Sequence, residues 1–320
     1  MRGEESPSRR YRSLLLTAAG MTWALVTMGG VVCTTGSGMG CEGWPACQGA
    51  VVPPLQLHAV IEYTHRLLAV TTFPLVLVVA ILAWRRYRGL PWLARPLTVV
   101  MVLFVAVAAF GAMVVLHGLP AWAAALDVGS ALTALALMVA VAAVASARSR
   151  ARTGSVRPSW SRPFARLSLA AVGLVFALLV TGVLVAAPQS IARCLGWPLY
   201  GGGALTADVA GWGGPVRHVL GLVAGVAVLA VVVGAALGRE RRPPVRRAGA
   251  GLGVALAAEI SAFAVLPVLG FPALLRVGYV ATTVAVWAFL VLVAVRAALP
   301  APAAATAGSA SRAERGFGAA

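Results

Sequence analysis

The sequence predicts an all-α integral membrane protein, with eight transmembrane helices arranged as two parallel-repeat four-helix bundles. Three observations support this fold class. Hydrophobic residues make up 60% of the 320 residues and charged residues only 11%, which is more apolar surface than a soluble domain can bury. Eight apolar runs are long enough to cross a bilayer, and the second half of the chain repeats the loop and helix pattern of the first.

Each apolar run is close to the roughly 20 residues that a helix needs to cross a bilayer. Leu, Val and Ala dominate the runs without the period-2 alternation of a β-barrel, so helices are expected. The first run follows "RRYR" and lacks an early small-residue cleavage site, so we interpret it as a retained helix rather than a signal peptide. The predicted spans lie near residues 13–33, 59–83, 97–117, 123–146, 165–187, 216–238, 249–269 and 273–298.

Arginine placement orients these helices. All 26 basic residues are arginine, and the net charge is +17. They cluster before the first span and in the loops after the second, fourth and sixth spans, whereas the loops between are nearly free of them. The positive-inside rule therefore predicts a multi-pass cell-membrane protein with both termini in the cytoplasm. Since topology accounts for the basic charge, we expect membrane lipid and no nucleic acid as partners.

The two long outer loops reveal an internal repeat. The first reads "TGSGMGCEGWPACQG" and the second reads "PQSIARCLGWPLYGG"; a shift of 153 positions aligns Cys41 with Cys194 and His65 with His218. A duplicated unit with an even number of helices gives parallel repeats. The predicted divisions are a cytoplasmic segment 1–12, a first half 13–147, a basic cytoplasmic linker 148–163, a second half 164–298 and a disordered cytoplasmic tail 299–320.

The stretch "IEYTHRLLAV" places three ionisable groups on one helix face. Glu62, His65 and Arg66 are separated by three and four positions. A single histidine near a helix end is usually a satisfied polar residue, but its repetition as His218 favours a ligand role. Inward histidines in a four-helix bundle suit heme iron, whereas zinc lacks a second donor at ligand spacing. A buried Glu62–Arg66 ion pair is the structural alternative.

The chain has four cysteines, and two of them lie close together in the sequence. Cys41 and Cys47 lie in the first outer loop, on the oxidising side of the membrane, where a disulfide closing a short loop is expected. Cys33 ends the first span, and Cys194 has Tyr200 where a partner would stand. Pairing between Cys33 and Cys194 is left open by the sequence.

The eight spans, the duplicated halves, "TGSGMGCEGWPACQG" and "IEYTHRLLA" together resemble the heme A synthase family (CtaA type), over residues from about 13 to 298. The resemblance implies oxidation of the C8 methyl group of heme O to a formyl group, which gives heme A for terminal oxidases. It also implies a heme pocket in each half, with heme O as substrate in the first half and heme b in the second. An enzyme that supplies heme O and oxidase assembly proteins are the partners it implies.

The resemblance also assigns roles to residues. His65 and His218 correspond to heme-iron ligands, Glu62 to a catalytic carboxylate acting beside His65, and Cys41 and Cys47 to a loop disulfide. The family has two further histidines, seven residues after the proline that opens the fourth and eighth helices. Asp127 and Tyr279 stand there instead, so the chain is a divergent member. Tyrosinate can ligate heme iron; Asp127 either binds iron weakly, binds a ligated water or pairs with Arg66.

Three more charged residues are assigned to the second half. Glu259 lies in mid-span, at a cost of roughly 2.5–3.5 kcal/mol, and lines the second pocket by resemblance, with a hydrogen bond in its protonated form as the alternative. Arg217 and Arg276 are rare basic groups near the outer side. Both are expected to bind heme propionates, with snorkelling to the lipid headgroups as the alternative.

Three functions follow from the sequence. The first is a heme-modifying oxidoreductase of the heme A synthase type. The second is a heme-binding or heme-handling membrane protein of the same family without oxidation chemistry, which the Asp127 and Tyr279 departures favour. The third is a transporter, suggested by the parallel duplication and weakened by the lack of broken helix pairs in mid-membrane. The sequence leaves the oligomeric state open.

Overall fold

In the computed structural model, α-helices make up most of the part of the chain that is described, with short turns and loops between them. That part comprises residues 6–41, 43, 47–49, 52–117, 120–148, 157–185, 191–195, 213–237 and 242–300. Eight of its helices are long and apolar enough to cross a membrane. The predicted fold class, an all-α multi-pass membrane protein, is confirmed. Parts of the predicted N-terminal segment, linker and tail (residues 1–5, 149–156 and 301–320) lie outside the described residues.

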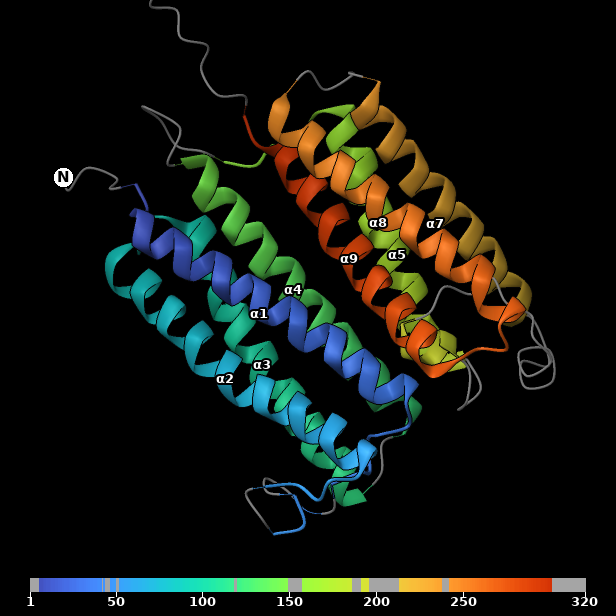
Figure 1. The fold of residues 1–320 in the computed structure, drawn as a ribbon. Helices are drawn as coiled ribbons and strands as arrows, with labels where there is room; N and C mark the ends of the chain where they lie inside the picture. The colour runs from blue at the N-terminus through green and yellow to red at the C-terminus, as the bar shows by residue number, and fades with distance from the viewer. Residues whose placement is uncertain are drawn as a thin grey trace, which may run out of the picture.

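The eight long helices form two groups that lie side by side (Figure 1), and the helix contacts place four in each group. The first group packs in a ring, with α1 and α3 each contacting both α2 and α4. In the second group α5 and α8 each contact both α7 and α9. The first group contains α1 (Arg9–Thr34), α2 (Leu57–Arg86), α3 (Pro91–His117) and α4 (Ala121–Arg148). The second contains α5 (Pro163–Val185), α7 (Gly213–Ala236), α8 (Pro243–Val268) and α9 (Ala273–Ala298), with a short η1 (Ile191–Cys194) after α5.

Several helices extend beyond the predicted spans. Helix α1 begins at Arg9 rather than 13, and α8 begins at Pro243 rather than 249. The hydrophobic criterion marks only the part of a helix that lies in lipid, whereas backbone hydrogen bonding continues into the polar ends. At α1 the Ser8 side chain accepts a hydrogen bond from the Tyr11 amide (3.2 Å) and caps the helix. The predicted boundaries of the two halves stay a prediction.

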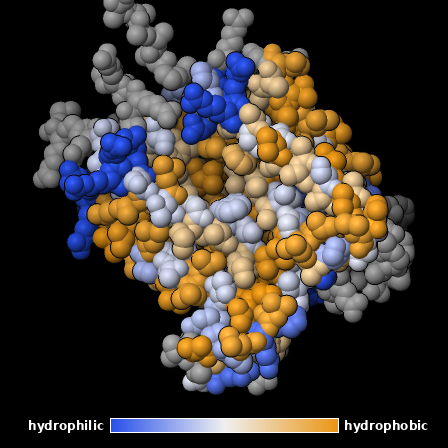
Figure 2. All heavy atoms as spheres, viewed as in Figure 1, coloured by the Kyte–Doolittle hydropathy of each residue, from blue (hydrophilic) through white to orange (hydrophobic). Residues whose placement is uncertain are grey.

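The two groups pack through their central helices. The membrane-spanning stretches of helices α4 and α9 are the most buried of the eight, and that of α3 is the least buried. The Trp287 side chain on α9 is buried and donates from Nε1 to the Leu132 carbonyl oxygen on α4 (3.1 Å). Its ring also packs against Phe176 of α5, with centroids 6.0 Å apart. Apolar side chains cover the flanks of the molecule, as a lipid environment requires (Figure 2).

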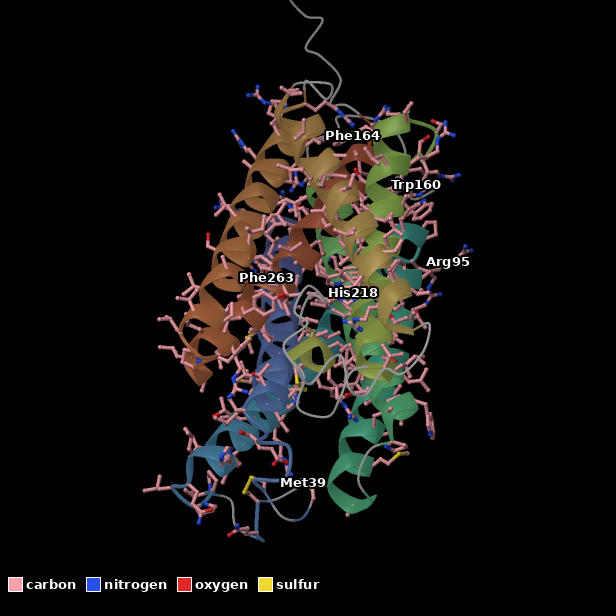
Figure 3. The ribbon with its side chains drawn as sticks, turned by 90° about the vertical axis from the view of Figure 1, so that its right-hand side faces the viewer. Met39, Arg95, Trp160, Phe164, His218 and Phe263 are labelled. Carbon is pink, nitrogen blue, oxygen red and sulfur yellow. A yellow bond between two sulfur atoms is a disulfide. The ribbon has the colours of Figure 1, made fainter. Side chains whose placement is uncertain are left out.

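Arginines hold one end of α9 in place. Arg162 and Arg242 both donate to the carbonyl oxygens of Ala297 and Leu299, at distances from 2.5 to 3.3 Å. These bonds satisfy carbonyl groups that a helix C-terminus leaves without partners. Figure 3 shows Trp160 and Phe164 at this arginine-bearing end and Met39 at the opposite end. The candidate site residues described below lie away from the arginine-bearing end.

Candidate functional site

The carboxylate of Glu62 joins helix α2 to the first outer loop. Glu62 is 4% exposed, and its Oε2 accepts the backbone N–H of Cys41 (2.9 Å). Its Oε1 accepts from the Arg66 guanidinium at 2.5 Å, one helical turn further along α2. The structure therefore contains the Glu62–Arg66 ion pair that the helical spacing suggested. Both carboxylate oxygens of Glu62 are engaged.

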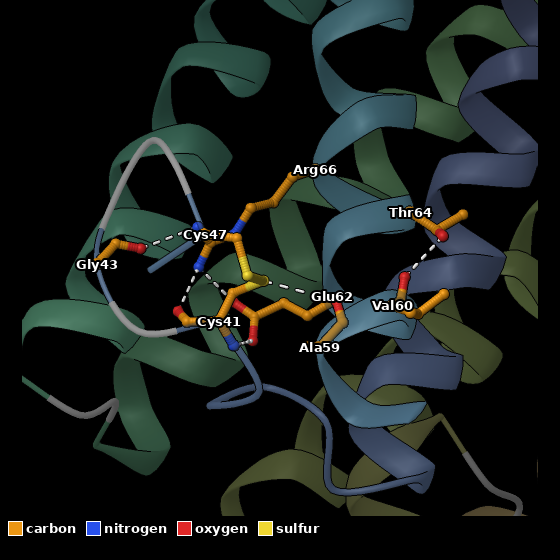
Figure 4. The surroundings of a disulfide bond; sticks show 8 residues. All are labelled: Cys41, Gly43, Cys47, Ala59, Val60, Glu62, Thr64 and Arg66. Carbon is orange, nitrogen blue, oxygen red and sulfur yellow. Dashed lines mark hydrogen bonds and ion pairs between the residues drawn. A yellow bond between two sulfur atoms is a disulfide. The ribbon is translucent and has the colours of Figure 1, made fainter. Parts of the chain in front are cut away.

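Arg66 also binds the loop, and the contacts of Glu62 and Arg66 with the loop are called the Glu62 clamp below. Its guanidinium also donates to the carbonyl oxygens of Gly43 (2.9 Å) and Cys41 (3.0 Å). The predicted disulfide between Cys41 and Cys47 is present, and both cysteines are fully buried (Figure 4). Three hydrogen bonds with Glu62 and Arg66 thus fix the disulfide loop to the N-terminal part of α2, and a fourth bond pairs these two residues with each other.

Two glycines allow close packing around this end of α2. A Cβ at Gly40 would lie 2.5 Å from the backbone carbonyl group of His58, so only glycine lets the loop rest against the start of the helix. A Cβ at Gly29 on α1 would lie 3.3 Å from Cε1 of His65. The missing side chain at Gly29 therefore leaves the room that the imidazole of His65 occupies.

The buried polar atoms without partners in the first half include two that belong to predicted site residues. The Nδ1 atom of His65 and the Oδ1 atom of Asp127 are both buried, and neither has a hydrogen-bond partner in the described chain. Helices α2 and α4 lie diagonally across the first bundle, since each packs against α1 and α3. Orphaned donors and acceptors are costly in an apolar interior. This pair fits a group with polar or metal-binding atoms bound between the two helices, as the predicted heme requires.

The Arg66 guanidinium does not pair with Asp127. Its hydrogen bonds run to Glu62 and to the loop carbonyls, and Oδ1 of Asp127 has no partner. The alternative that joined Asp127 to Arg66 therefore receives no support. The structure brings together Glu62, Arg66 and both loop cysteines, and it places His65 and Asp127 on two diagonal helices with no contact to this cluster through His65 Nδ1 or Asp127 Oδ1.

The second half contains a different cluster. Glu259 on α8 is 3% exposed and accepts hydrogen bonds from the hydroxyl groups of Thr283 (2.6 Å) and Thr282, both on α9. The Tyr279 side chain, also on α9 and fully buried, is a further hydrogen-bond partner of Glu259. The ring of Phe263 packs 6.5 Å from that of Tyr279. Glu259 is thus hydrogen-bonded to α9, while its predicted place in the second pocket and the alternative of a bond in its protonated form both stay predictions.

Arg217 is the most unusual group of this half. It lies in the first turns of α7, is only 6% exposed, and interacts electrostatically with Tyr279. None of its three guanidinium nitrogens has a hydrogen-bond partner within the described ranges. Arg276 on α9 likewise has a buried Nε without a partner. A buried cation without a counter-charge is unfavourable, so Arg217 fits an anionic group such as a carboxylate, and half-buried Arg276 has one free donor that could join it.

His218 and Tyr279 occupy helices that face each other diagonally. Helices α7 and α9 each pack against α5 and α8, which repeats the relation between α2 and α4. His218 is exposed on the surface of α7, next to buried Arg217. Figure 3 shows His218 and Phe263 at a similar height along the bundle, away from Trp160 and Phe164. The pair His65 and Asp127 in the first half and the pair His218 and Tyr279 in the second therefore lie on equivalent pairs of diagonal helices.

A second disulfide joins the two halves. Cys33 at the end of α1 pairs with Cys194 in η1, with Cα atoms 5.5 Å apart. The sequence left this pairing open, and the only signal for it was that two cysteines remained after Cys41 and Cys47 had been paired. Leu195 and Val280 lie nearby, since a Cβ on Gly30 of α1 would contact both side chains. The second outer loop is thus tethered to the first half of the molecule.

Comparison with known proteins gives matches over most of the chain. A family model described as cytochrome oxidase assembly protein (COX15-CtaA) matches residues 55–295. The heme A synthase of Bacillus licheniformis is 30% identical over 188 residues, 58% of this chain and 61% of that protein. The heme A synthases of Alkalihalophilus pseudofirmus (28% over 190 residues; 59% and 63%) and Staphylococcus haemolyticus (30% over 200 residues; 60% and 64%) are similar. The matched region spans about three-fifths of the length of these curated relatives.

Proposed function

The chain belongs to the COX15-CtaA family of cytochrome oxidase assembly proteins, as a divergent member related to the heme A synthases, and on this premise we propose that it oxidises the C8 methyl group of heme O to a formyl group. The product, heme A, serves terminal oxidases. The observation that carries the proposal is the set of buried, unpartnered polar atoms on diagonal helices: His65 and Asp127 in the first half, Arg217 and Arg276 in the second.

In this proposal the first half binds heme O. His65 ligates the iron, and Asp127 lies on the helix across the bundle. Heme iron supplies the redox chemistry when the heme is bound. The protein residues bind the substrate, orient its methyl group and exclude water. Gly29 contributes by leaving space beside the His65 imidazole.

Glu62 has a positioning role in this proposal. Both of its oxygens are bound to groups that hold the first outer loop, so its charge is already neutralised by Arg66. The loop and its disulfide then close the outer end of the bundle beside His65. A carboxylate used in this way acts on the reaction through the loop that it fixes.

The second half binds heme b in the proposed arrangement. His218 ligates the iron, with Tyr279 as the residue on the facing helix. Arg217 and Arg276 bind the propionates, because guanidinium groups form strong charge-assisted hydrogen bonds with carboxylates. Glu259 holds Tyr279 through a side-chain hydrogen bond and is itself fixed by Thr282 and Thr283.

The proposed setting is the cell membrane, with both termini in the cytoplasm and with the disulfides on the oxidising side. The arginine-bearing end then faces the cytoplasm. The proposed partners are an enzyme that supplies heme O and proteins of oxidase assembly.

A second function is favoured by a specific observation. Asp127 and Tyr279 replace two imidazoles, and Tyr279 is hydrogen-bonded to Glu259. A protein that binds or delivers heme without oxidising it would tolerate such ligands. The transporter alternative has no such support, since the chain belongs to a family of oxidase assembly proteins.

The two functions separate in a single experiment. The full chain is expressed in a membrane host that makes heme O but no heme A, and the hemes are extracted and separated. If the protein carries out the oxidation, we expect more heme A than in an empty-vector control. The heme A should be lost in His65→Ala and retained in His58→Ala. Heme b or heme O that co-purifies without heme A would support the heme-binding function. Absence of any heme in the purified protein would overturn both.

A further inference from the structure

A groove opens between α7 and α8 near the arginine-bearing end of the second half. Its volume is about 520 Å³, within the size range of small-molecule sites in proteins. Hydrophilic residues gather at the end of the molecule where α1 and α8 begin, above the apolar flanks (Figure 2). The groove is lined by Val232, Ala235, Ala236, Pro243, Arg246, Arg247, Gly249, Ala250 and Gly253.

Small residues account for the shape of this groove. A Cβ on Gly249 would lie 2.5 Å from the Cβ of Ala235, so α7 and α8 approach closely at this level. A Cβ on Gly253 would come within 3.4 Å of Val232 one turn further along. The close approach forms the floor, and the short side chains of Ala236 and Ala250 leave the space above it open. The walls are therefore apolar and smooth.

Two exposed arginines lie at the mouth of the groove. Within the described chain, the side chains of Arg246 and Arg247 make no hydrogen bond or ion pair, whereas the guanidinium of neighbouring Arg242 is bound to the end of α9. Arg247 also lines an adjoining cavity of about 210 Å³ between α8 and α9, together with Arg296 and Phe289. No residue that lines either cavity is acidic. The site is an apolar channel with concentrated positive charge at its polar end.

We propose that this groove binds an anionic phospholipid. The phosphate contacts Arg246 and Arg247, because guanidinium groups match phosphate geometry with two parallel hydrogen bonds. One acyl chain lies along the Ala- and Gly-lined floor between α7 and α8. Basic pockets between transmembrane helices are known sites for anionic headgroups. The position fits, since the groove runs from a helix end into the apolar span.

A heme is not the occupant that these residues select. None of the lining residues is histidine, cysteine, methionine or tyrosine, so no side chain of the groove offers the usual axial ligands of heme iron. The groove also lies toward the ends of α7 and α8 that are opposite to Arg217 and His218. The lipid site is therefore independent of the function proposed above.

The test measures lipid retention by the purified full-length protein. Delipidated protein in detergent is titrated with phosphatidylglycerol or phosphatidylcholine, and bound lipids are counted by native mass spectrometry. We expect the unmodified protein to retain phosphatidylglycerol selectively. The double variant Arg246→Gln/Arg247→Gln is expected to bind it roughly 10- to 30-fold more weakly, since each arginine near an anionic lipid contributes about 1 kcal/mol.

Two further variants keep the test decisive. Arg85→Gln/Arg95→Gln removes the same charge from exposed positions in the α2–α3 hairpin, and is expected to leave retention unchanged. Ala250→Trp fills the groove without changing its charge and is expected to abolish retention. Circular dichroism checks that each variant remains helical.

Three results would overturn the proposal. If both double variants lost phosphatidylglycerol equally, the effect would come from the net charge of the protein rather than from the groove. Equal retention of phosphatidylcholine would exclude recognition of an anionic headgroup. Binding of glycerol phosphate as tight as that of the lipid, with Ala250→Trp unaffected, would leave only a phosphate site.

Discussion

The two halves of the molecule use their buried carboxylates in different ways. Glu62 in the first half lies at the outer end of α2 and binds the backbone of a disulfide loop. Glu259 in the second half lies within α8 and binds hydroxyl groups of the neighbouring helix α9. The duplication has kept histidines in register, at His65 and His218, while the acidic groups have moved to separate tasks. Repetition of architecture therefore does not imply repetition of chemistry.

The arginines make the contrast stronger. Arg66 is engaged by Glu62 and by two loop carbonyls, whereas the three guanidinium nitrogens of Arg217 have no hydrogen-bond partner in the described parts of the chain. The polar groups of the first outer loop are satisfied by the protein itself. The guanidinium of Arg217 beside Tyr279 is not satisfied in this way, which is the contrast on which the proposed anion-binding role of the second half rests.

The largest effect is expected from breaking the Glu62 clamp. Glu62→Ala leaves the Arg66 guanidinium and the Cys41 amide without their buried partner, which costs about 3–5 kcal/mol of stability. The thermal midpoint in detergent and protection of the first outer loop from proteolysis measure this loss. Thr64→Ala is the matched control, since exposed Thr64 bonds only to the carbonyl of its own helix at Val60 (Figure 4). An unchanged midpoint in Glu62→Ala would show that the clamp does not stabilise the loop.

The next effect concerns the tether between the halves. Replacing Cys33 and Cys194 with serine is expected to cost about 2–4 kcal/mol, because the bond closes a long loop of chain. The same change at Cys41 and Cys47 removes a link across a sequence separation of only 6 and is expected to cost less. Thermal unfolding under non-reducing conditions compares the two variants. A larger loss at Cys41 and Cys47 would reverse this ranking.

Replacing a buried arginine is expected to change the stability of the heme-free protein in opposite directions in the two halves. Arg217→Met removes an unpaired buried cation and should stabilise the heme-free protein by about 1 kcal/mol or more. Arg66→Met removes a paired one and should destabilise it. Thermal midpoints of heme-free protein test the signs, and heme content after expression tests the cost to binding. Destabilisation by Arg217→Met would mean that Arg217 has a partner in the protein.

The smallest expected effect lies in the Glu259 cluster. Thr283→Val removes a 2.6 Å hydrogen bond to the carboxylate while keeping the shape of the side chain, at a cost of about 1–2 kcal/mol. Thr133→Val is the control, since Thr133 on α4 bonds only to the carbonyl of Gly129 within its own helix. Equal losses in the two variants would argue against a specific role for the carboxylate.

Local pattern predicted much of the fold and part of the site. Apolar runs defined the eight helices, because lipid demands continuous hydrophobic spans. The four-residue spacing of Glu62 and Arg66 anticipated their ion pair, and the short separation of Cys41 and Cys47 anticipated their disulfide. These features depend on positions near each other in the chain.

Contacts between segments that are distant in the chain could not be predicted from local sequence pattern. Helical periodicity cannot show that Cys33 meets Cys194, because this depends on how α1 packs against the second half. The partners of Glu259 on α9 depend on the rotation of two helices about their axes. The helix ends at Arg9 and Pro243 were missed because hydrophobicity reports lipid contact rather than hydrogen bonding.

The Cys33–Cys194 bond has a consequence for the order in which the protein is made. Four cysteines allow three pairings, and Cys41 and Cys47 emerge long before Cys194. At bacterial or eukaryotic synthesis rates the 161 positions between Cys33 and Cys194 take roughly 10–30 s to translate. During that interval Cys33 is a free thiol beside a newly formed disulfide. The contacts of Glu62 and Arg66 with this loop lie entirely within the first half, so they can form around the early pair before Cys194 has been made.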